Sequence, residues 1–118
     1  MTANSIERQG NKFNGLPPDF QQAIRTSDYD LGLETITKKH KLHIDQSAVL
    51  EDLLARFIFG EIESSNLISE MESKMNLSKD AAVEIVKDID ILVIVPIREN
   101  LQKIQSSGDV EIKTEANI

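Results

Sequence analysis

The chain has 118 residues, and its 13 Lys and Arg against 20 Asp and Glu give a formal net charge of −7 at pH 7. This length and the 40% hydrophobic content suit a single folded domain. The negative charge opposes non-specific binding to nucleic acid and anionic membranes, and four Phe, one Tyr and no Trp leave few rings for base stacking. The lack of Cys and of an apolar signal sequence favours the cytoplasm.

The two ends of the chain are polar. Residues 1–15 contain Ile6 and Phe13 among Asn, Gly and charged residues, which predicts a disordered N-terminal arm. The alternative is a short docking segment that Phe13 pins to the domain. Residues 106–118, with the sequence SSGDVEIKTEANI, are predicted to form a disordered acidic tail. The folded domain is therefore expected over residues 16–105.

Four short segments carry apolar residues at three- and four-residue steps, the spacing of amphipathic helices. The first opens at Leu16-Pro17-Pro18-Asp19, where proline is tolerated in the first turn, and ends near Ser27. The next three are expected over residues 29–40, 46–59 and about 64–75. Together with a longer helix after them, they predict an all-α fold, a compact bundle of about five helices.

Particular side chains are expected to mark the helix ends. The predicted N-caps are Asp28, Asp45 and Ser64 or Ser65. Ile44 is expected to close over Val49 as a hydrophobic staple at the start of the third helix. Gly60 is predicted to end that helix, because glycine adopts a left-handed backbone without strain.

The longest predicted helix runs from Leu77 to Gln105, with Ser78 as its N-cap. Pro96 has no N–H to donate to the carbonyl of Leu92, so we expect a kink there or a break into two helices. The apolar run 91–97, ILVIVPI, also suits a buried strand, but the helical spacing continues on both sides of it. Seven residues are too few to span a bilayer, which takes about 20.

The same run suggests where the protein meets others. Five consecutive large apolar residues cover more than half of a helix circumference, so this helix is either buried all round or contributes a contact surface. We expect the latter, with a second copy of the chain or a partner helix covering Ile91, Ile94 and Val95. Arg98 could rim this surface with a charge-assisted hydrogen bond, or instead pair with Glu99 or Asp90.

Several pieces of the sequence resemble a known group. They are LPPDFQQAI, KKHKLHIDQSAVLEDL, GEI, LSKDAAVEIVKDID and PIRENLQKI, with His43-Ile44-Asp45-Gln46 and Pro96-Ile97-Arg98-Glu99 as the most specific. Over residues 16–104 the chain resembles a small helical domain of uncharacterised hypothetical proteins from candidate-phyla (patescibacterial) bacteria. The resemblance implies a helical fold and a bacterial cytoplasmic setting, and no activity or site residues. The chain departs from the pattern of that group in its unbroken apolar run 91–95.

Catalysis and metal binding find little support in the residues. The sequence contains no glycine-rich phosphate loop and no Ser-His-Asp arrangement with a supporting strand. The carboxylates of Asp88 and Asp90, like the other close acidic pairs, do not share a helix face. His40 and His43 lack a third ligand. We expect a protein without catalytic residues, cofactor or metal, and with no evident small-molecule substrate.

The basic cluster Lys38, Lys39, His40 and Lys41 falls in the last turn of a predicted helix, where cations interact favourably with the helix dipole. A phosphate- or acid-binding patch is the alternative.

Three classes of binding protein remain. The expected one is a non-catalytic interaction module, an adaptor or small subunit that self-associates or binds a partner helix through residues 91–97. An acidic DNA mimic or inhibitor is the alternative, because −7 on a small body is a usable field. A helix-turn-helix regulator built from residues 46–59 and 64–75 is less favoured, since its second helix has Glu70 and Glu72 against Lys74.

Overall fold

The computed structural model describes the backbone of residues 5–117 and the side chains of residues 5–106. The elements are the 3₁₀ turn η1 (Glu7–Gln9), the helices α1 (Asn11–Asn14), α2 (Pro18–Thr26), α3 (Tyr29–Lys39), α4 (Ile44–Ile58), α5 (Ser64–Lys74) and α6 (Lys79–Ile89), the π-helical turn η2 (Asp90–Ile94), and α7 (Val95–Asn117). No strand occurs in this described part. The predicted all-α fold is confirmed, and the apolar run 91–97 is helical.

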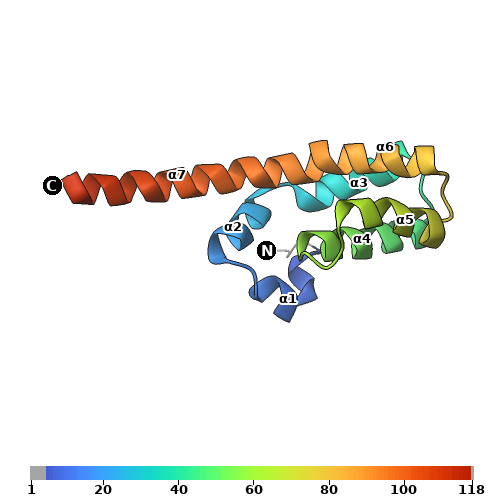
Figure 1. The fold of residues 1–118 in the computed structure, drawn as a ribbon, viewed down its shortest axis with the longest axis horizontal. Helices are drawn as coiled ribbons and strands as arrows, with labels where there is room; N and C mark the ends of the chain where they lie inside the picture. The colour runs from blue at the N-terminus through green and yellow to red at the C-terminus, as the bar shows by residue number, and fades with distance from the viewer. Residues whose placement is uncertain (1–4, 118) are drawn as a thin grey trace.

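The helices are arranged around one long axis (Figure 1). α6, η2 and α7 follow one another end to end along the molecule, whose extents are 59 × 27 × 24 Å. α3 packs against α6 and η2, α5 packs against α4 and α6, and α2 lies against α7. The core between them contains Ile24, Ile36, Leu50, Leu53, Leu54, Leu67, Met71, Met75, Ile85, Ile89 and Val93. Past α2, the end of α7 projects from the body (Figure 1).

Several helix ends form as the residues predict. Pro18 occupies the first turn of α2, and Ser78 Oγ accepts a hydrogen bond of 3.1 Å from the N–H of Ala81 at the start of α6. Gly60 follows α4 with a φ of +80°, which lets the N–H of Glu61 reach back 2.8 Å to the Arg56 carbonyl.

The start of α4 differs from the prediction. The N-cap is His43 and not Asp45, and the N–H of His43 donates to Gln46 Oε1 over 2.9 Å. Gln46 can bond in this way because it stands three residues after the cap, the spacing of a capping box. Ile44 is 91% exposed, so it does not close over Val49.

Two other predicted caps also require correction. α5 begins at Ser64 with Glu63 as its N-cap, in place of Ser64 or Ser65. Asp28 is the N-cap of α3, but its side chain makes no capping hydrogen bond. Helix ends fray and shift by one or two residues, which leaves the helices themselves unaffected.

The N-terminal segment packs onto the body from Ser5 onward. Ile6 and Phe13 are each 1% exposed. The Ser5 hydroxyl and N–H donate to Asp30 Oδ1 over 2.8 and 3.0 Å, and Arg25 lies 5.3 Å above the Phe13 ring. The structure therefore corrects the expected disordered arm for residues 5–15, and the alternative in which Phe13 pins the segment fits these contacts. Residues 1–4 lie outside the described residues.

The C-terminal helix also differs from the expected boundaries. Its backbone continues past Gln105 to Asn117, across most of the segment that we predicted as a disordered tail. No proline follows Pro96, so no residue in this stretch lacks the N–H that a helix needs. Residue 118 lies outside the described residues.

A wider turn precedes Pro96. The N–H of Val95 donates to the carbonyl of Asp90, five residues back, as in a π-helix. This turn lies beside Gly32 of α3, which is buried. A Cβ atom on Gly32 would stand 2.9 Å from the Leu92 carbonyl oxygen and 3.0 Å from Val93 Cγ2. Only glycine at this position allows α3 to approach η2 this closely. The kink that we expect at Pro96 stays a prediction.

Replacing Gly32 by Ala is expected to lower the free energy of unfolding by about 1–3 kcal/mol, because the added methyl group overpacks the α3–η2 contact. Gly15→Ala is the matched control, since a Cβ there meets its nearest neighbour, the Asn11 carbonyl oxygen, at 3.4 Å. Urea unfolding followed by far-UV circular dichroism measures both variants. Equal stability of the two would contradict the close approach.

Removing the Phe13 side chain tests the packing of the N-terminal segment. Phe13→Ala is expected to destabilise the protein by about 3–5 kcal/mol, as for other fully buried aromatic residues. The matched substitution Asn14→Ala, at an exposed neighbour, should change stability by less than about 0.5 kcal/mol. A segment that does not pack would make the two variants indistinguishable in the same unfolding experiment.

Candidate functional site

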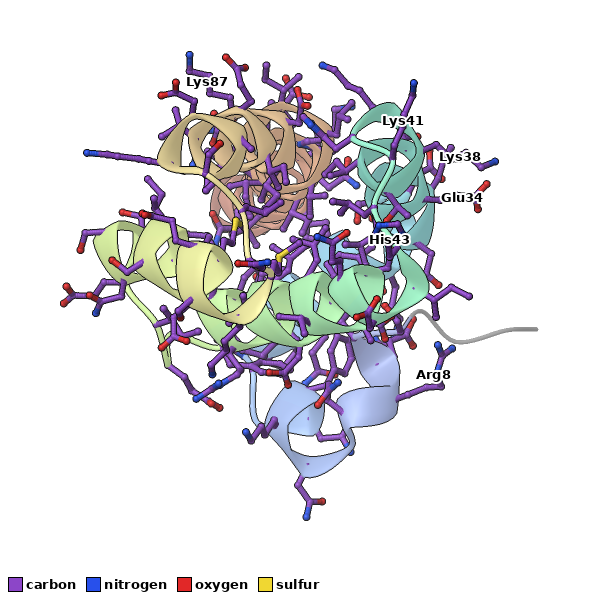
Figure 2. The ribbon with its side chains drawn as sticks, turned by 90° about the vertical axis from the view of Figure 1, so that its right-hand side faces the viewer. Arg8, Glu34, Lys38, Lys41, His43 and Lys87 are labelled. Carbon is purple, nitrogen blue, oxygen red and sulfur yellow. The ribbon has the colours of Figure 1, made fainter. Side chains whose placement is uncertain are left out.

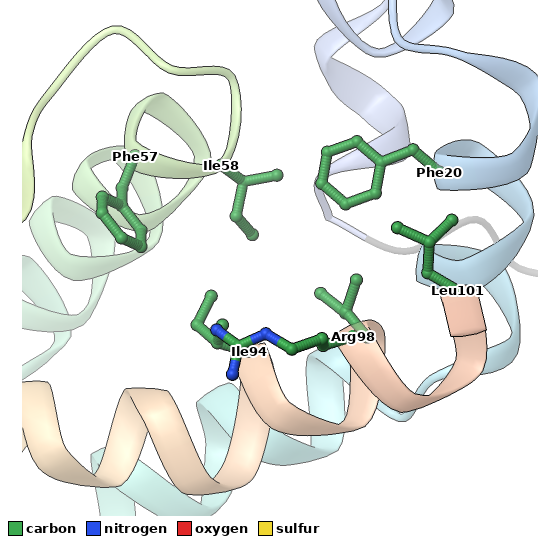
Figure 3. Close-up of a pocket in the computed structure, with 7 residues that line it drawn as sticks. Phe20, Phe57, Ile58, Ile94, Arg98 and Leu101 are labelled. Atoms are coloured by element: carbon green, nitrogen blue, oxygen red, sulfur yellow. The ribbon is translucent and has the colours of Figure 1, made fainter.

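An apolar pocket of about 250 Å³ opens where α2, α4 and α7 meet (Figure 3). Figure 3 shows Phe57 and Ile58 on one side, Phe20 on the other, and α7 along the bottom. The lining residues are Phe20, Phe57, Ile58, Ile94, Ile97, Arg98 and Leu101. They come from three separate parts of the sequence, so only the folded chain forms this pocket.

Hydrogen bonds and ion pairs hold the walls in place. The Asn100 side chain donates to Thr26 Oγ1 over 3.2 Å, which fixes α2 and its Phe20 against α7. Beyond the end of α4, Glu61 pairs with Lys12 at 2.9 Å and with Arg56 at 3.6 Å. The hydrogen bond from Lys12 is the main reason that the pKa of Glu61 lies below its ordinary value. These exposed ion pairs add little by themselves, and α4 is held in place mainly by its buried residues Leu53 and Leu54.

Arg98 is the charged residue of this lining. It is exposed, and it forms no ion pair or hydrogen bond with the residues whose side chains the structure describes. The pairing with Glu99 or Asp90 that the sequence allowed is thus not seen among them. A guanidinium group beside an apolar hollow can donate two parallel hydrogen bonds to a carboxylate.

The four residues of the predicted interaction surface are divided between two faces. Ile94 and Arg98 line the pocket, whereas Ile91 and Val95 do not. Ile91 is 63% exposed and Val95 is half-buried. These two are four residues apart and share a helix face, which turns away from the pocket.

Sequence reasoning missed most of the pocket. Phe20, Phe57 and Ile58 lie on the apolar faces of their helices, and that pattern is typical of core residues. All three are only partly buried. They stand near the ends of α2 and α4, where a neighbouring helix no longer covers them, and no spacing in the sequence reports that.

A second hollow, of about 210 Å³, lies between α3 and the start of α7. Its lining includes Leu31, Leu92 and Pro96, and Leu31 is 58% exposed. A third hollow, of about 220 Å³, is more polar and lies beside Asp30 and Glu51. Neither hollow is lined by any of the four residues predicted to bind a partner, Ile91, Ile94, Val95 and Arg98. The pocket at Ile94 and Arg98 is therefore the candidate site.

The basic cluster has a structural role that the sequence did not reveal. His40 Nε2 donates to Asp88 Oδ2 over 2.6 Å, and Lys39 Nζ donates to Oδ1 over 3.1 Å. These bonds join the end of α3 to α6, and Asp88 is 9% exposed. Burial raises the pKa of the Asp88 carboxyl, but the hydrogen bonds from His40 and Lys39 oppose it and hold the pKa below its ordinary value.

The remaining cluster residues point outward. Figure 2 shows Lys38 and Lys41 directed away from the body at this end of the bundle, and Lys38 pairs with Glu34 at 2.8 Å. Two of the four cluster residues are thus committed to Asp88 and a third to Glu34. A phosphate-binding role for the cluster gains no support from this arrangement.

Other kinds of site are not seen in the described part of the chain. Between residues 5 and 106 no three His, Asp or Glu side chains come together as metal ligands. No described helix is long and apolar enough to cross a bilayer.

Comparisons of the chain with protein-family models, with curated proteins and with solved structures find no match. The resemblance to patescibacterial proteins therefore stays an expectation.

Asp88→Asn is expected to lower the free energy of unfolding at pH 7 by on the order of 1 kcal/mol, because it weakens the charge-assisted bonds to His40 and Lys39. The lowered pKa means that the carboxylate stabilises the fold above its unfolded pKa of about 4, and that this contribution disappears as the pH falls through the folded value. The difference from wild type should therefore shrink in acid.

Urea unfolding at pH 7 and below pH 4 measures this difference. Asp90→Asn is the control, because Asp90 is exposed and follows directly after α6, which contains Asp88. A difference between wild type and Asp88→Asn that does not depend on pH would contradict the ionic contribution of Asp88.

Proposed function

We propose that this protein is a non-catalytic interaction module, an adaptor or small subunit, which docks a helix of a partner protein in the pocket between α2, α4 and α7. The observation that carries the proposal is the apolar pocket whose lining includes Arg98, a guanidinium group without an ion-pair partner among the described side chains. The absence of Cys is compatible with a reducing setting such as the cytoplasm.

The pocket suits helix-in-groove recognition. Partner side chains spaced at i, i+3 and i+4 could insert between Phe20 on one side and Phe57 and Ile58 on the other. Each fully buried Leu, Ile or Phe side chain contributes about 1.5–3 kcal/mol. A carboxylate one turn away could then accept hydrogen bonds from Arg98. The preferred partner is therefore an amphipathic helix with an acidic residue beside its apolar face.

Two other functions compete with this one. The acidic DNA mimic or inhibitor remains the alternative, and the net charge of −7 favours it. A helix-turn-helix regulator is less favoured, because Lys74, the lysine of α5, pairs with Glu70 at 3.0 Å. The neighbouring carboxylate offsets the charge of Lys74, which weakens the attraction of this helix for phosphate.

Selection from a displayed library of helical peptides tests the proposal. Wild type should enrich peptides with apolar residues at i and i+3 or i+4 and a nearby Asp or Glu. Ile94→Glu should lose these peptides. Arg98→Glu should weaken them at least about tenfold, which corresponds to about 1.4 kcal/mol, and should favour Lys at the acidic position.

Lys103→Glu is the matched control, since it makes the same charge change on the same helix outside this pocket. It should leave binding unchanged. Far-UV circular dichroism checks that each variant keeps its helix content, and the exposed Arg98 keeps the test valid if Ile94→Glu unfolds. Peptides that bind Arg98→Glu and wild type equally would overturn the proposal.

A further inference from the structure

We infer that the polar hollow between α3, α4 and the N-terminal segment binds an alkylammonium group, held by Glu51, Ser47 and Tyr29. This hollow shares no lining residue with the pocket between α2, α4 and α7, so the inference does not depend on the proposed function. Three observations support it: the negative charge of the lining, a carboxylate without a partner, and two buried hydroxyl groups without partners.

The lining of the polar hollow is negative. The hollow has a volume of about 220 Å³, and its charged lining residues are Asp30, Glu34, Glu51 and Arg8. Figure 2 shows Glu34 and Arg8 on the same side of the bundle. Because three carboxylates outweigh one guanidinium group, the field in the hollow attracts cations.

The three carboxylates differ in the partners that they already have. Asp30 accepts hydrogen bonds from the hydroxyl and the N–H of Ser5, and Glu34 pairs with Lys38 at 2.8 Å. Glu51 forms no hydrogen bond or ion pair with any residue whose side chain the structure describes. Glu51 is therefore the carboxylate of this lining that can accept a hydrogen bond from a ligand.

Two hydroxyl groups near Glu51 also lack partners. Ser47 lines the hollow one helical turn before Glu51 and on the same face of α4. Ser47 Oγ and Tyr29 Oη are both buried, and neither has a hydrogen-bond partner within the described part of the chain. Burial raises the pKa of the Tyr29 hydroxyl, and the nearby carboxylates of Glu51 and Asp30 raise it further. Since buried polar groups are nearly always bonded, two such hydroxyl groups beside one carboxylate point to a ligand.

An ammonium group matches this set of acceptors. It carries three N–H donors and no acceptor, and the Glu51 carboxylate and the two hydroxyl oxygens can each accept one of them. A guanidinium group is planar and pairs with a carboxylate through two parallel bonds, which suits this arrangement less well. The ammonium group could belong to a lysine side chain of a partner protein or to a free polyamine, because both present the same chemistry.

Titration of the full chain, followed through its amide signals by NMR, tests the site. n-Butylammonium chloride should shift the signals around Ser47 and Glu51 and reach saturation. Tetramethylammonium chloride carries the same charge without an N–H donor, so it should bind at least about tenfold more weakly.

Variants assign the contacts. Glu51→Gln should raise the dissociation constant of n-butylammonium at least about tenfold. Tyr29→Phe should raise it about threefold to tenfold and leave the free protein at least as stable, because the hydroxyl that it removes has no partner in the fold. Asp52→Asn is the matched control, since it removes the same charge from the exposed face of α4, one residue away, and should leave binding unchanged. Circular dichroism checks that each variant is folded.

Two further probes distinguish the sources of the ammonium group. Spermidine represents a free polyamine, and the peptide acetyl-Ala-Lys-Ala-amide represents a lysine of a partner protein. Binding of only one of them assigns the site to that source, and binding of both leaves the ammonium group itself as the ligand.

Equal binding of n-butylammonium and tetramethylammonium by wild type would overturn the inference, because a general attraction of cations would then explain the shifts. The inference would also fail if no probe gave a saturable shift, or if Glu51→Gln bound n-butylammonium as tightly as wild type. None of these results would bear on the docking of helices in the pocket at Ile94 and Arg98.

Discussion

The close approach of α3 to the helical rod formed by α6, η2 and α7 is the contact on which the rest of the structure depends. Gly32 has no side chain, so the backbone of α3 can lie against the Leu92 carbonyl and the Val93 side chain. Leu92 and Val93 belong to the π-helical turn η2, which lies immediately before Pro96 in the rod. A little further along, His40 and Lys39 hold Asp88 on the same rod. One steric contact and one ionic contact thus align α3 with the rod.

The candidate pocket follows from how the other helices meet this rod. α2 lies across α7 and is held there by Asn100, while α4 ends at Ile58, two residues before Gly60, without reaching α2. The space between these two helix ends is not filled, and Phe20 and Phe57 border it from opposite sides. Because the walls are anchored helices, a partner would meet a largely preformed surface and lose little conformational entropy in binding it.

The apolar run 91–97 serves two purposes at once. Val93 and Ile97 face the core and are nearly fully buried, whereas Ile94 is available to the pocket and Ile91 is exposed. A helix that is apolar around most of its circumference is not needed for a one-sided core. The excess supplies part of the apolar lining on which our proposal of helix docking rests, and Arg98 adds a positive charge to this lining.

The sequence by itself determined the all-α class, the helices over most of the chain, and the ends at Pro18, Gly60 and Ser78, because these depend on spacing and on bonds within a few residues. It also identified Ile94 and Arg98 as surface candidates. Only the tertiary structure decided that Phe13 packs inward, that Asp88 joins α3 to α6, and that Phe20 meets Phe57 and Ile58 across a pocket. Those contacts link residues tens of positions apart, and periodicity reports which face of a helix is apolar but not which other element covers it.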